Sequence, residues 1–386
     1  SLLPIIIHGE AANTSGITKK HEILATFPLG ISLFSQRIGN ILSSCSMNIF
    51  FKKFLWLFAT LTILLSTAGQ AADYAWKKVE RNGVEYVDLS QVKGFYKFPT
   101  LSLSGSRIEM KNKDITVLFA AGSQEVLMNN VKFIFSNSII AINGSYHVSV
   151  TDLLKIIDPI LRPASIASAT PFDTVIIDPG HGGSDPGCSN SLGTEANYNL
   201  KVARMLKDHL TKLKFKVVMT RNSDKFLTLQ QRVNIANKYS NAIFVSIHFN
   251  AIGQRGRNRA RGIETFTLSP VGVAHYGRSL KASDFVLKAG NRQDSANIAL
   301  ATAIHWGTRM HLKKAGMEVP DRGVRRARFS VLTGVKHPAI LLEGGFMSHP
   351  TEARLIHSTA YQKTLARSIC DSIVFYRTAT IQRRKR

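Results

Sequence analysis

Residues 174–183 read TVIIDPGHGG and decide the fold of the second half of the chain. Four apolar or β-branched residues predict a buried strand, and the run then breaks into a glycine-rich loop that carries His181. Two later stretches end in the same way, because the strand predicted over 242–247 runs into His248 and the strand over 339–342 runs into Glu343. Ligands of open α/β sheets bind beyond the carboxyl ends of the strands, so these polar residues mark a candidate site.

The pattern around these three strands predicts an α/β domain with a mixed, mostly parallel sheet flanked by helices. Apolar residues recur at helical spacing after residue 195, and short β-branched runs alternate with further helical patterns toward the C-terminus. The expected strands are 174–177, 216–220, 242–247, 262–268 and 339–342, and the expected helices begin near 195 and cover 229–238, 295–312 and 351–376.

Two histidines and a carboxylate at one sheet edge match the ligand set of a catalytic zinc site, which leaves a fourth position for water. His181 and His248 are the candidate imidazoles, although either residue is alternatively a loop or capping histidine. Glu195 is the candidate carboxylate because it opens a helix behind Thr194, a suitable N-cap. A carboxylate placed only to favour the helix dipole fits that spacing equally well.

The separated motifs resemble those of the zinc-dependent N-acetylmuramoyl-L-alanine amidases, which cut bacterial cell wall. The resemblance runs from residue 173 to 376 and is carried by several motifs in order, which is far more specific than a single Gly-His-Gly. They are Asp178-Pro-Gly-His181-Gly-Gly, the helix start at Glu195, Arg221, Arg232, Ala236-Asn237, Ser246-Ile-His248-Phe-Asn250-Ala, Arg322-Gly323-Val324 before Val331-Leu332, and Leu342-Glu343-Gly-Gly-Phe346.

This resemblance implies that His181, Glu195 and His248 hold Zn²⁺ and that Glu343 is the catalytic carboxylate. Glu343 then acts as general base on the zinc-bound water, with a fourth ligand as its alternative role. The implied reaction is hydrolysis of the amide between N-acetylmuramic acid and L-alanine of peptidoglycan, in cell-wall remodelling and daughter-cell separation. A zinc peptidase acting on the stem peptide and a catalytically silent wall-binding regulator are the alternatives.

Further residues are candidates for supporting roles. Asp178 and Asn250 are expected to orient the imidazoles, and Glu264 is either a site carboxylate or a structural residue at the sheet edge. Arg325 and Arg326, with Arg328, are candidates for binding the acidic stem peptide, and a solvated basic loop is the alternative. In some amidases of this family, a helix between the position of His248 and the next motif covers the zinc until an activator displaces it. Residues 281–289 show only a weak helical pattern, which argues against such autoinhibition here.

The first part of the chain divides into several predicted segments. Residues 47–72 are typical of a secretory signal peptide, with Lys52 and Lys53 before an apolar run that is too short for the roughly 20 residues of a membrane span. Alternating short runs separated by Asn-Gly and similar turns predict a small β-rich domain, which serves binding or spacing or simply packs on its neighbour. The predicted organisation is an upstream segment 1–46, the signal peptide 47–72, the β-rich domain 73–162, a linker 163–171, the zinc amidase domain 172–377 and a basic tail 378–386.

Composition adds the expected location and partners. The formal net charge is +25, and 44% of residues are hydrophobic, which is typical of a globular protein with an anionic partner. Together with the signal peptide this favours export to the periplasm or cell envelope, with peptidoglycan as substrate, a protein activator as a possible partner, no nucleic acid, and no stable membrane span after cleavage. Cys188 and Cys370 follow the signal peptide and form either one disulfide or two unpaired thiols.

Overall fold

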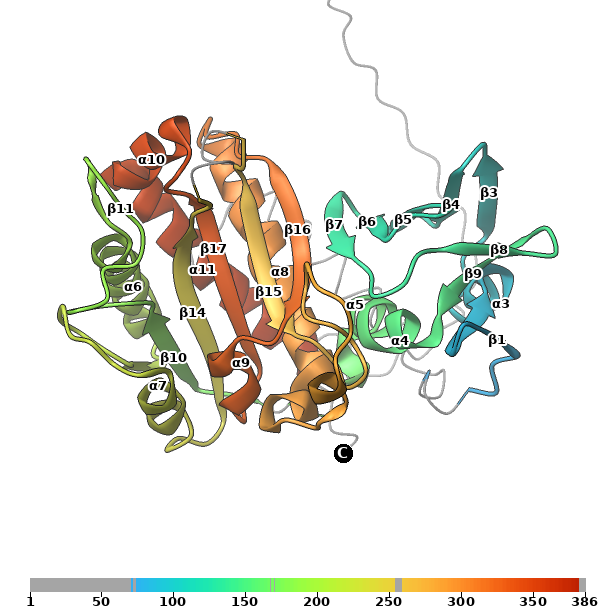
Figure 1. Cartoon of the computed structure of the whole chain (residues 1–386), viewed down its shortest axis with the longest axis horizontal. Helices are drawn as coiled ribbons and strands as arrows, with labels where there is room; N and C mark the ends of the chain where they lie inside the picture. Colours follow the sequence, from blue (N-terminus) through green and yellow to red (C-terminus); the bar gives the residue numbers. More distant parts are fainter. Residues whose placement is uncertain (1–70, 72–73, 167, 170, 254–258, 382–386) are drawn as a thin grey trace, which may run out of the picture. The chain divides into compact units, whose positions relative to one another are not determined.

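The computed structural model describes residue 71 and residues 74–166, 168–169, 171–253 and 259–381 (Figure 1). The predicted upstream segment, nearly all of the signal peptide and the end of the basic tail lie outside these residues. Within the described residues, no helix is both long and apolar enough to cross a membrane.

The β-rich region consists of antiparallel strands joined by tight turns. One sheet has the order β1-β2-β9-β8, and β3 to β7 form a meander in which each strand pairs with the next. The Asn-Gly turns have positive φ at both residues, for example 52° at Asn82 and 74° at Gly83, as tight hairpins require. The elements are β1 (Lys78–Arg81), β2 (Val84–Asp88), α3 (Leu89–Phe95), β3 (Thr100–Ser104), β4 (Arg107–Lys111), β5 (Thr116–Ala120), β6 (Glu125–Met128), β7 (Val131–Ile134), β8 (Ile140–Ile142), β9 (Ser145–Ser149), α4 (Val150–Asp152), η2 (Leu153–Ile157), α5 (Asp158–Leu161) and η3 (Pro163–Ser165).

The second region is a mixed sheet with the strand order β13-β10-β14-β17-β15-β16. The first four strands are parallel, β15 runs antiparallel to β17, and β16 is parallel to β15. The prediction of a mixed, mostly parallel sheet flanked by helices is confirmed. The strands are β10 (Thr174–Pro179), β13 (Lys216–Met219), β14 (Ala242–Asn250), β15 (Ile263–Leu268), β16 (Asp321–Ala327) and β17 (Ala339–Phe346), beside the short hairpin β11 (Ser189–Asn190) and β12 (Gly193–Thr194).

Helices cover both faces of this sheet (Figure 1). The long helices α6, α8 and α11 pack on one face, and the short helices α7 and α9 pack on the other over a core that includes Phe244, Phe266 and Leu332. The helices are α6 (Glu195–Lys212), α7 (Leu229–Ala236), α8 (Asp294–Lys314), α9 (Ser330–Gly334), α10 (Pro350–His357) and α11 (Thr359–Thr380).

Three expectations differ from the structure in their local detail. The single helix predicted over 351–376 is two helices, because Ser358 ends α10 and its side chain caps α11 by accepting from the Tyr361 amide. The segment around Arg325, for which a solvated basic loop was one reading, is strand β16. The weakly helical residues 281–289 form no α-helix, and contain the short 3₁₀ turn η5 (Ala282–Phe285) and the first residue of a second one, η6 (Ala289–Gln293).

Strand pairing also joins the β-rich region to the second sheet. β7 lies parallel to β16 with Val324 opposite Phe133, so the meander of β3 to β7 and the second sheet form one continuous sheet of eleven strands, from which the sheet β1-β2-β9-β8 is separate. Asp321 at the start of β16 accepts a hydrogen bond from the Lys132 amide at 3.2 Å. The outer edge of β16 is therefore covered by the β-rich region.

Candidate metal centre

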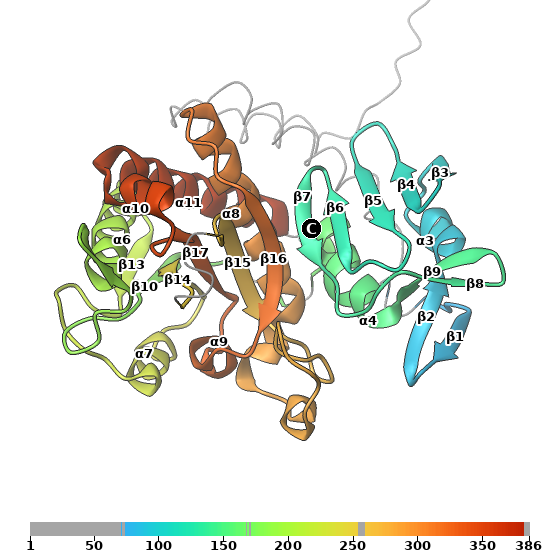
Figure 2. The same cartoon turned by 45° about the horizontal axis from the view of Figure 1, so that its top comes forward.

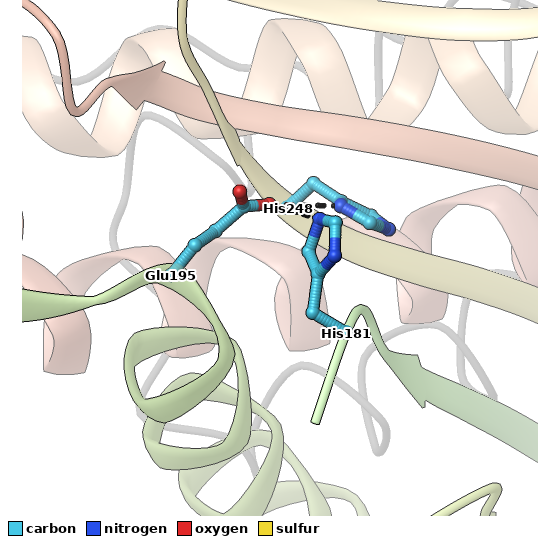
Figure 3. A group of neighbouring side chains, drawn as sticks. All are labelled: His181, Glu195 and His248. Carbon is cyan, nitrogen blue, oxygen red and sulfur yellow. Dashed lines mark hydrogen bonds and ion pairs between the residues drawn. The ribbon is translucent and has the colours of Figure 1, made fainter. Parts of the chain in front are cut away.

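The sheet brings His181, Glu195 and His248 together from three different elements. β10 and β14 are adjacent and parallel, with Pro179 opposite Ile247, so His181 just beyond β10 comes beside His248 in β14. Glu195 enters as the first residue of α6. Figure 3 shows the two imidazoles and the carboxylate pointing toward one another.

The three side chains form a compact set of donor atoms. The Glu195 Oε1 atom lies 3.1 Å from His181 Nε2 and 2.9 Å from His248 Nδ1. One potential ligand atom from each of the three residues falls within 4.8 Å of the others. Imidazole nitrogens and a carboxylate oxygen converging in this way are the donor set that a tetrahedral metal site requires.

The approach of the side chains depends on glycine at two nearby positions. A Cβ atom on Gly180 would lie 2.0 Å from His248 Cε1, and one on Gly187 would lie 2.6 Å from Glu195 Oε2. Any other residue at either position would displace an imidazole or the carboxylate. His181 itself has a φ of 59°, a left-handed backbone conformation that the following Gly182 and Gly183 continue.

Glu195 is buried and held as a carboxylate. Thr194 caps α6, and the Glu195 side chain accepts from the amides of Cys188 at 3.0 Å and Phe249 at 3.3 Å. Burial opposes ionisation, but hydrogen bonds with His181 and His248 outweigh it and lower the pKa of Glu195. An ionised carboxylate is the state that binds a divalent cation.

Glu343 lies beside this cluster but does not belong to the set of three potential ligands. It is paired with His248 in the register of β14 and β17, and it lines the same cavity of about 480 Å³ as the three ligand candidates. Burial raises the pKa of the Glu343 carboxyl well above its usual range, and the negative charges of Glu195 and Glu264 raise it further. Its Oε2 atom has no hydrogen-bond partner among the described residues.

The family model described as N-acetylmuramoyl-L-alanine amidase matches residues 175–374, which include the whole cluster and Glu343. The chain belongs to this amidase family.

Individual relatives of this amidase-family chain match over the same region. The probable cell wall amidase LytH of Staphylococcus epidermidis is 32% identical over 206 residues, which cover 53% of this chain and 58% of the relative. The amidase AmiC of Escherichia coli O6:H1 is 33% identical over 231 residues, covering 54% of each chain. The chain thus spans little more than half the length of these relatives. A solved amidase from Clostridium difficile 630 is 32% identical, covers 54% of this chain and 97% of its own, and gives a TM-score of 0.43.

A residue that the sequence analysis missed orients His181 in this amidase-family site. Asp185 Oδ2 lies 2.8 Å from His181 Nδ1, while Asp185 Oδ1 accepts from the Gly187 amide. The contact leaves His181 Nε2 facing the cluster. The signal was present in the sequence as an aspartate four residues after the histidine in the same glycine-rich loop.

Asp178 has partners other than the imidazoles that it was expected to orient. Its buried carboxylate accepts from Thr220 at 2.6 Å, from Ser246 at 2.8 Å and from Arg232 Nη1 at 2.9 Å. Arg232 also donates to the carbonyl oxygens of Pro179 and His181. Asp178 therefore holds the backbone of the loop through Arg232.

Asn250 and Glu264 form a second polar group next to Glu343. Glu264 lies opposite Glu343 in the pairing of β15 and β17 and accepts from Asn250 Nδ2 at 2.7 Å. Arg322 donates to the same carboxylate at 2.7 Å, and its guanidinium lies over the Phe346 ring. The Asn250 side chain thus donates to Glu264, whereas it was expected to orient an imidazole.

Arg325 and Arg326 are buried in β16 and do not lie in a solvated basic loop. Arg325 pairs with Glu264 at 3.3 Å and stacks on Tyr276. Arg326 donates to Asp152 at 3.1 Å and to the Ser136 hydroxyl. Because they are neighbours in an extended strand, their side chains leave opposite faces of the sheet.

The two cysteines also fall in different surroundings. Cys188 lines the cavity of the candidate centre, whereas Cys370 is buried in α11. No disulfide joins them in the described structure.

Proposed function

We propose that the protein is a zinc-dependent N-acetylmuramoyl-L-alanine amidase that hydrolyses the amide between N-acetylmuramic acid and L-alanine of peptidoglycan. The observation that supports this most directly is the placement of Glu343 beside a compact His-Glu-His cluster in one cavity. Family membership supplies the substrate class, and the cluster supplies a means of cutting an amide.

The donor set fits zinc. His181, Glu195 and His248 would hold the ion, with Asp185 fixing the ring of His181. Bound zinc supplies a water of lowered pKa and polarises the amide carbonyl. The remaining side of the cluster opens into the cavity of about 480 Å³, where the scissile amide would lie.

Glu343 is proposed as the general base and acid. Its carboxyl is desolvated and its pKa is raised, so that it takes up a proton far more readily than an exposed glutamate. It would remove a proton from the attacking water as the C–O bond forms. It would return that proton to the L-alanine nitrogen as the C–N bond breaks, because an amide nitrogen does not leave as an anion.

The polar group around Glu264 is proposed to support Glu343. Asn250, Arg322 and Arg325 all contact Glu264, which stands directly across the strand pair from Glu343. Two of these contacts are with cations, so the Glu264 charge is largely balanced. This arrangement keeps a polar strand edge ordered beside the reacting groups.

Export to the cell envelope is proposed from the predicted signal peptide and the named cell-wall relatives, with the periplasm as the expected compartment. There the enzyme would act in wall remodelling and separation of daughter cells. The high positive charge is suited to retention on an anionic wall. A protein activator is a further proposal, which the digestion below separates from intrinsic activity.

Digestion of purified peptidoglycan by the zinc-loaded protein tests the proposal. We expect release of intact stem peptides that carry a free L-alanine amino terminus, identified by mass. Chelation of the metal and Glu343→Gln should each abolish release, whereas the matched exposed variant Glu80→Gln in β1 should digest like the parent.

The products discriminate between the alternatives. Fragments cut within the stem peptide would identify a zinc peptidase. Wall binding with no metal-dependent product would indicate the regulator or the need for an activator, and addition of cell-envelope extract would then restore release only in the second case.

A further inference from the structure

The segment that follows β15 exposes an unusual number of apolar side chains. Residues 280–287, here called the apolar loop, lie in the orange segment that projects near α9 (Figure 2). Soluble surfaces rarely gather large apolar side chains in one short stretch without a binding role. The exposed fractions are 49% for Leu280, 60% for Phe285, 49% for Val286 and 64% for Leu287.

Buried polar contacts fix the apolar loop in this outward position. Asp284 is fully buried between the exposed residues and accepts from both terminal nitrogens of Arg278 at 2.7 and 2.6 Å. It also pairs with Arg328 of the polypeptide just after β16 at 2.8 Å. The Asp284 carbonyl oxygen accepts from Arg328 Nη2 and from the Gly272 amide.

The chain after the apolar loop is also held against the fold, at Gly290 and Asn291. A Cβ on Gly290 would lie 2.1 Å from the Leu332 carbonyl oxygen, so the backbone there packs directly on α9. Asn291 donates to the Ser269 carbonyl oxygen at 2.9 Å. With both ends tied to the fold, Phe285, Val286 and Leu287 stay at the surface.

The charges around the apolar loop are of one sign. Lys281 within it and Lys288 directly after it are exposed, and Arg278 and Arg292 lie nearby in sequence. Asp284 is the only acidic residue from 270 to 293, and it is neutralised by Arg278 and Arg328. Exposed Phe, Val and Leu between lysines match an interfacial segment that places apolar side chains among acyl chains and cations among anionic headgroups.

The direction of β15 sets where this surface lies relative to the metal centre. Glu264 near the start of β15 is opposite Glu343, and β15 runs antiparallel to β17. The apolar loop follows the other end of β15, so it is at the sheet edge away from His181 and His248. A surface bound there would leave the metal centre accessible.

We propose that the apolar loop docks the protein on an anionic phospholipid membrane, with Phe285 and Leu287 inserted into the interfacial layer and Lys281 and Lys288 on the headgroups. Docking would hold the metal centre directed away from the lipid, toward a substrate outside the membrane. The proposal is independent of the amidase activity, because none of these residues lines the cavity with Glu343.

Sedimentation with vesicles tests the docking. The protein from residue 71 onward is mixed with vesicles of phosphatidylcholine alone or with phosphatidylglycerol added. We expect binding to the anionic vesicles, and Phe285→Asp combined with Leu287→Asp should reduce the partition coefficient by about tenfold or more. Leu103→Asp in β3, which is 57% exposed outside the loop, is the matched control and should bind like the parent.

Tryptophan fluorescence then separates insertion from simple charge attraction. Phe285→Trp should gain a blue-shifted component on anionic vesicles that brominated lipids quench. Binding without that shift, or equal binding by the double aspartate variant and the parent, would overturn the proposal. So would loss of self-association by the double variant in the absence of any vesicle binding, which would assign the surface to a second copy of the chain.

Discussion

Single residues in the glycine-rich loop position the side chains of the proposed metal centre. Gly180 leaves room for the His248 ring, and Asp185 sets the orientation of the His181 ring. Neither Gly180 nor Asp185 is itself a ligand candidate. Their effects can therefore be separated from those of Glu343, which should alter turnover without altering the metal content.

Gly180→Ala should empty the metal centre while the fold persists. The added methyl group would overlap the His248 imidazole, whose Cε1 atom is 2.0 Å from the ideal Cβ position, so the ring must swing away. We expect a loss of bound zinc by elemental analysis together with an almost unchanged circular dichroism spectrum. Gly94→Ala in α3, where a Cβ meets nothing within 4 Å, should retain zinc like the parent. Full zinc occupancy in Gly180→Ala would contradict the placement of His248 as a ligand.

Asp185→Asn should weaken metal binding without abolishing it. The amide can still contact His181 Nδ1 but no longer supplies the negative charge that fixes the ring and raises its basicity. A decrease in zinc affinity of about 10- to 100-fold is expected from competition with a chelating dye. Asp224→Asn, which changes a carboxylate that accepts from the Gly183 amide, serves as the matched variant. An affinity equal to that of the parent would exclude the orienting role.

At the scale of elements, the apolar strands made most of the fold and of the candidate site predictable from the sequence. Thr174–Pro179 is buried throughout and Ala339–Phe346 is buried except at Glu343, so their positions and the sheet class followed from the sequence. β16 did not follow, because three arginines in it suggest solvent. Arg325 and Arg326 are buried because they meet Glu264 and Asp152, which are distant in the sequence and reach them only in the folded chain.

Some residues of the candidate site could likewise be predicted from the sequence, and others could not. His181, Glu195, His248 and Glu343 stand out because His181, His248 and Glu343 follow predicted strands and Glu195 begins a predicted helix, and the structure brings the four together. The supporting contacts were harder to predict, since Asp178 and Asn250 lie near the ligands in sequence but bind Arg232 and Glu264. Proximity along the chain does not specify which way a side chain points in a strand.

Asp321 at the start of β16 should stabilise the fold in a pH-dependent manner. It accepts from buried His305 at 2.9 Å, pairs with Arg309 and binds the Lys132 amide. Burial opposes ionisation of Asp321, but the contacts with His305 and Arg309 prevail and lower its pKa. Asp321→Asn should therefore reduce the free energy of unfolding near neutral pH by about 1 to 3 kcal/mol, measured with urea.

The sign of the pH effect follows from the lowered pKa. A carboxyl group with a lower pKa in the folded state stabilises the fold above its unfolded pKa of about 3.9, and this contribution is lost as pH falls through the folded pKa. The difference in stability between the parent and Asp321→Asn should thus shrink on acidification below about pH 4. A difference that grew with acidification would contradict the ion pairs described.

At the scale of the whole molecule, one buried ion pair connects the β-rich region with the second sheet. Asp152 accepts from the amides of Ser136 and Asn137 and from Arg326 of β16. The contact with Arg326 is buried, and the two contacts with the amides are partly buried. The β-rich region is therefore expected to contribute to the stability of the sheet that carries the metal centre.

Asp152→Asn should strongly destabilise the protein. The substitution leaves Arg326 buried without its counter-charge, which costs about 3 to 5 kcal/mol. Urea unfolding followed by circular dichroism measures the loss. Adding Arg326→Met should recover part of the stability, because the uncompensated charge is then removed. A double variant no more stable than Asp152→Asn alone would show that Arg326 is not the cause.

The pairing of β7 with β16 has a consequence for how the molecule can be divided. A fragment that starts at residue 171 would keep every ligand candidate and Glu343, but it would leave one side of β16 with unpaired amides and carbonyls. Bare strand edges recruit other strands, and Val324 on that edge is apolar. Such a fragment should form edge-to-edge aggregates. The β-rich region therefore also keeps the sheet beside it soluble, because it covers the strand edge at β16.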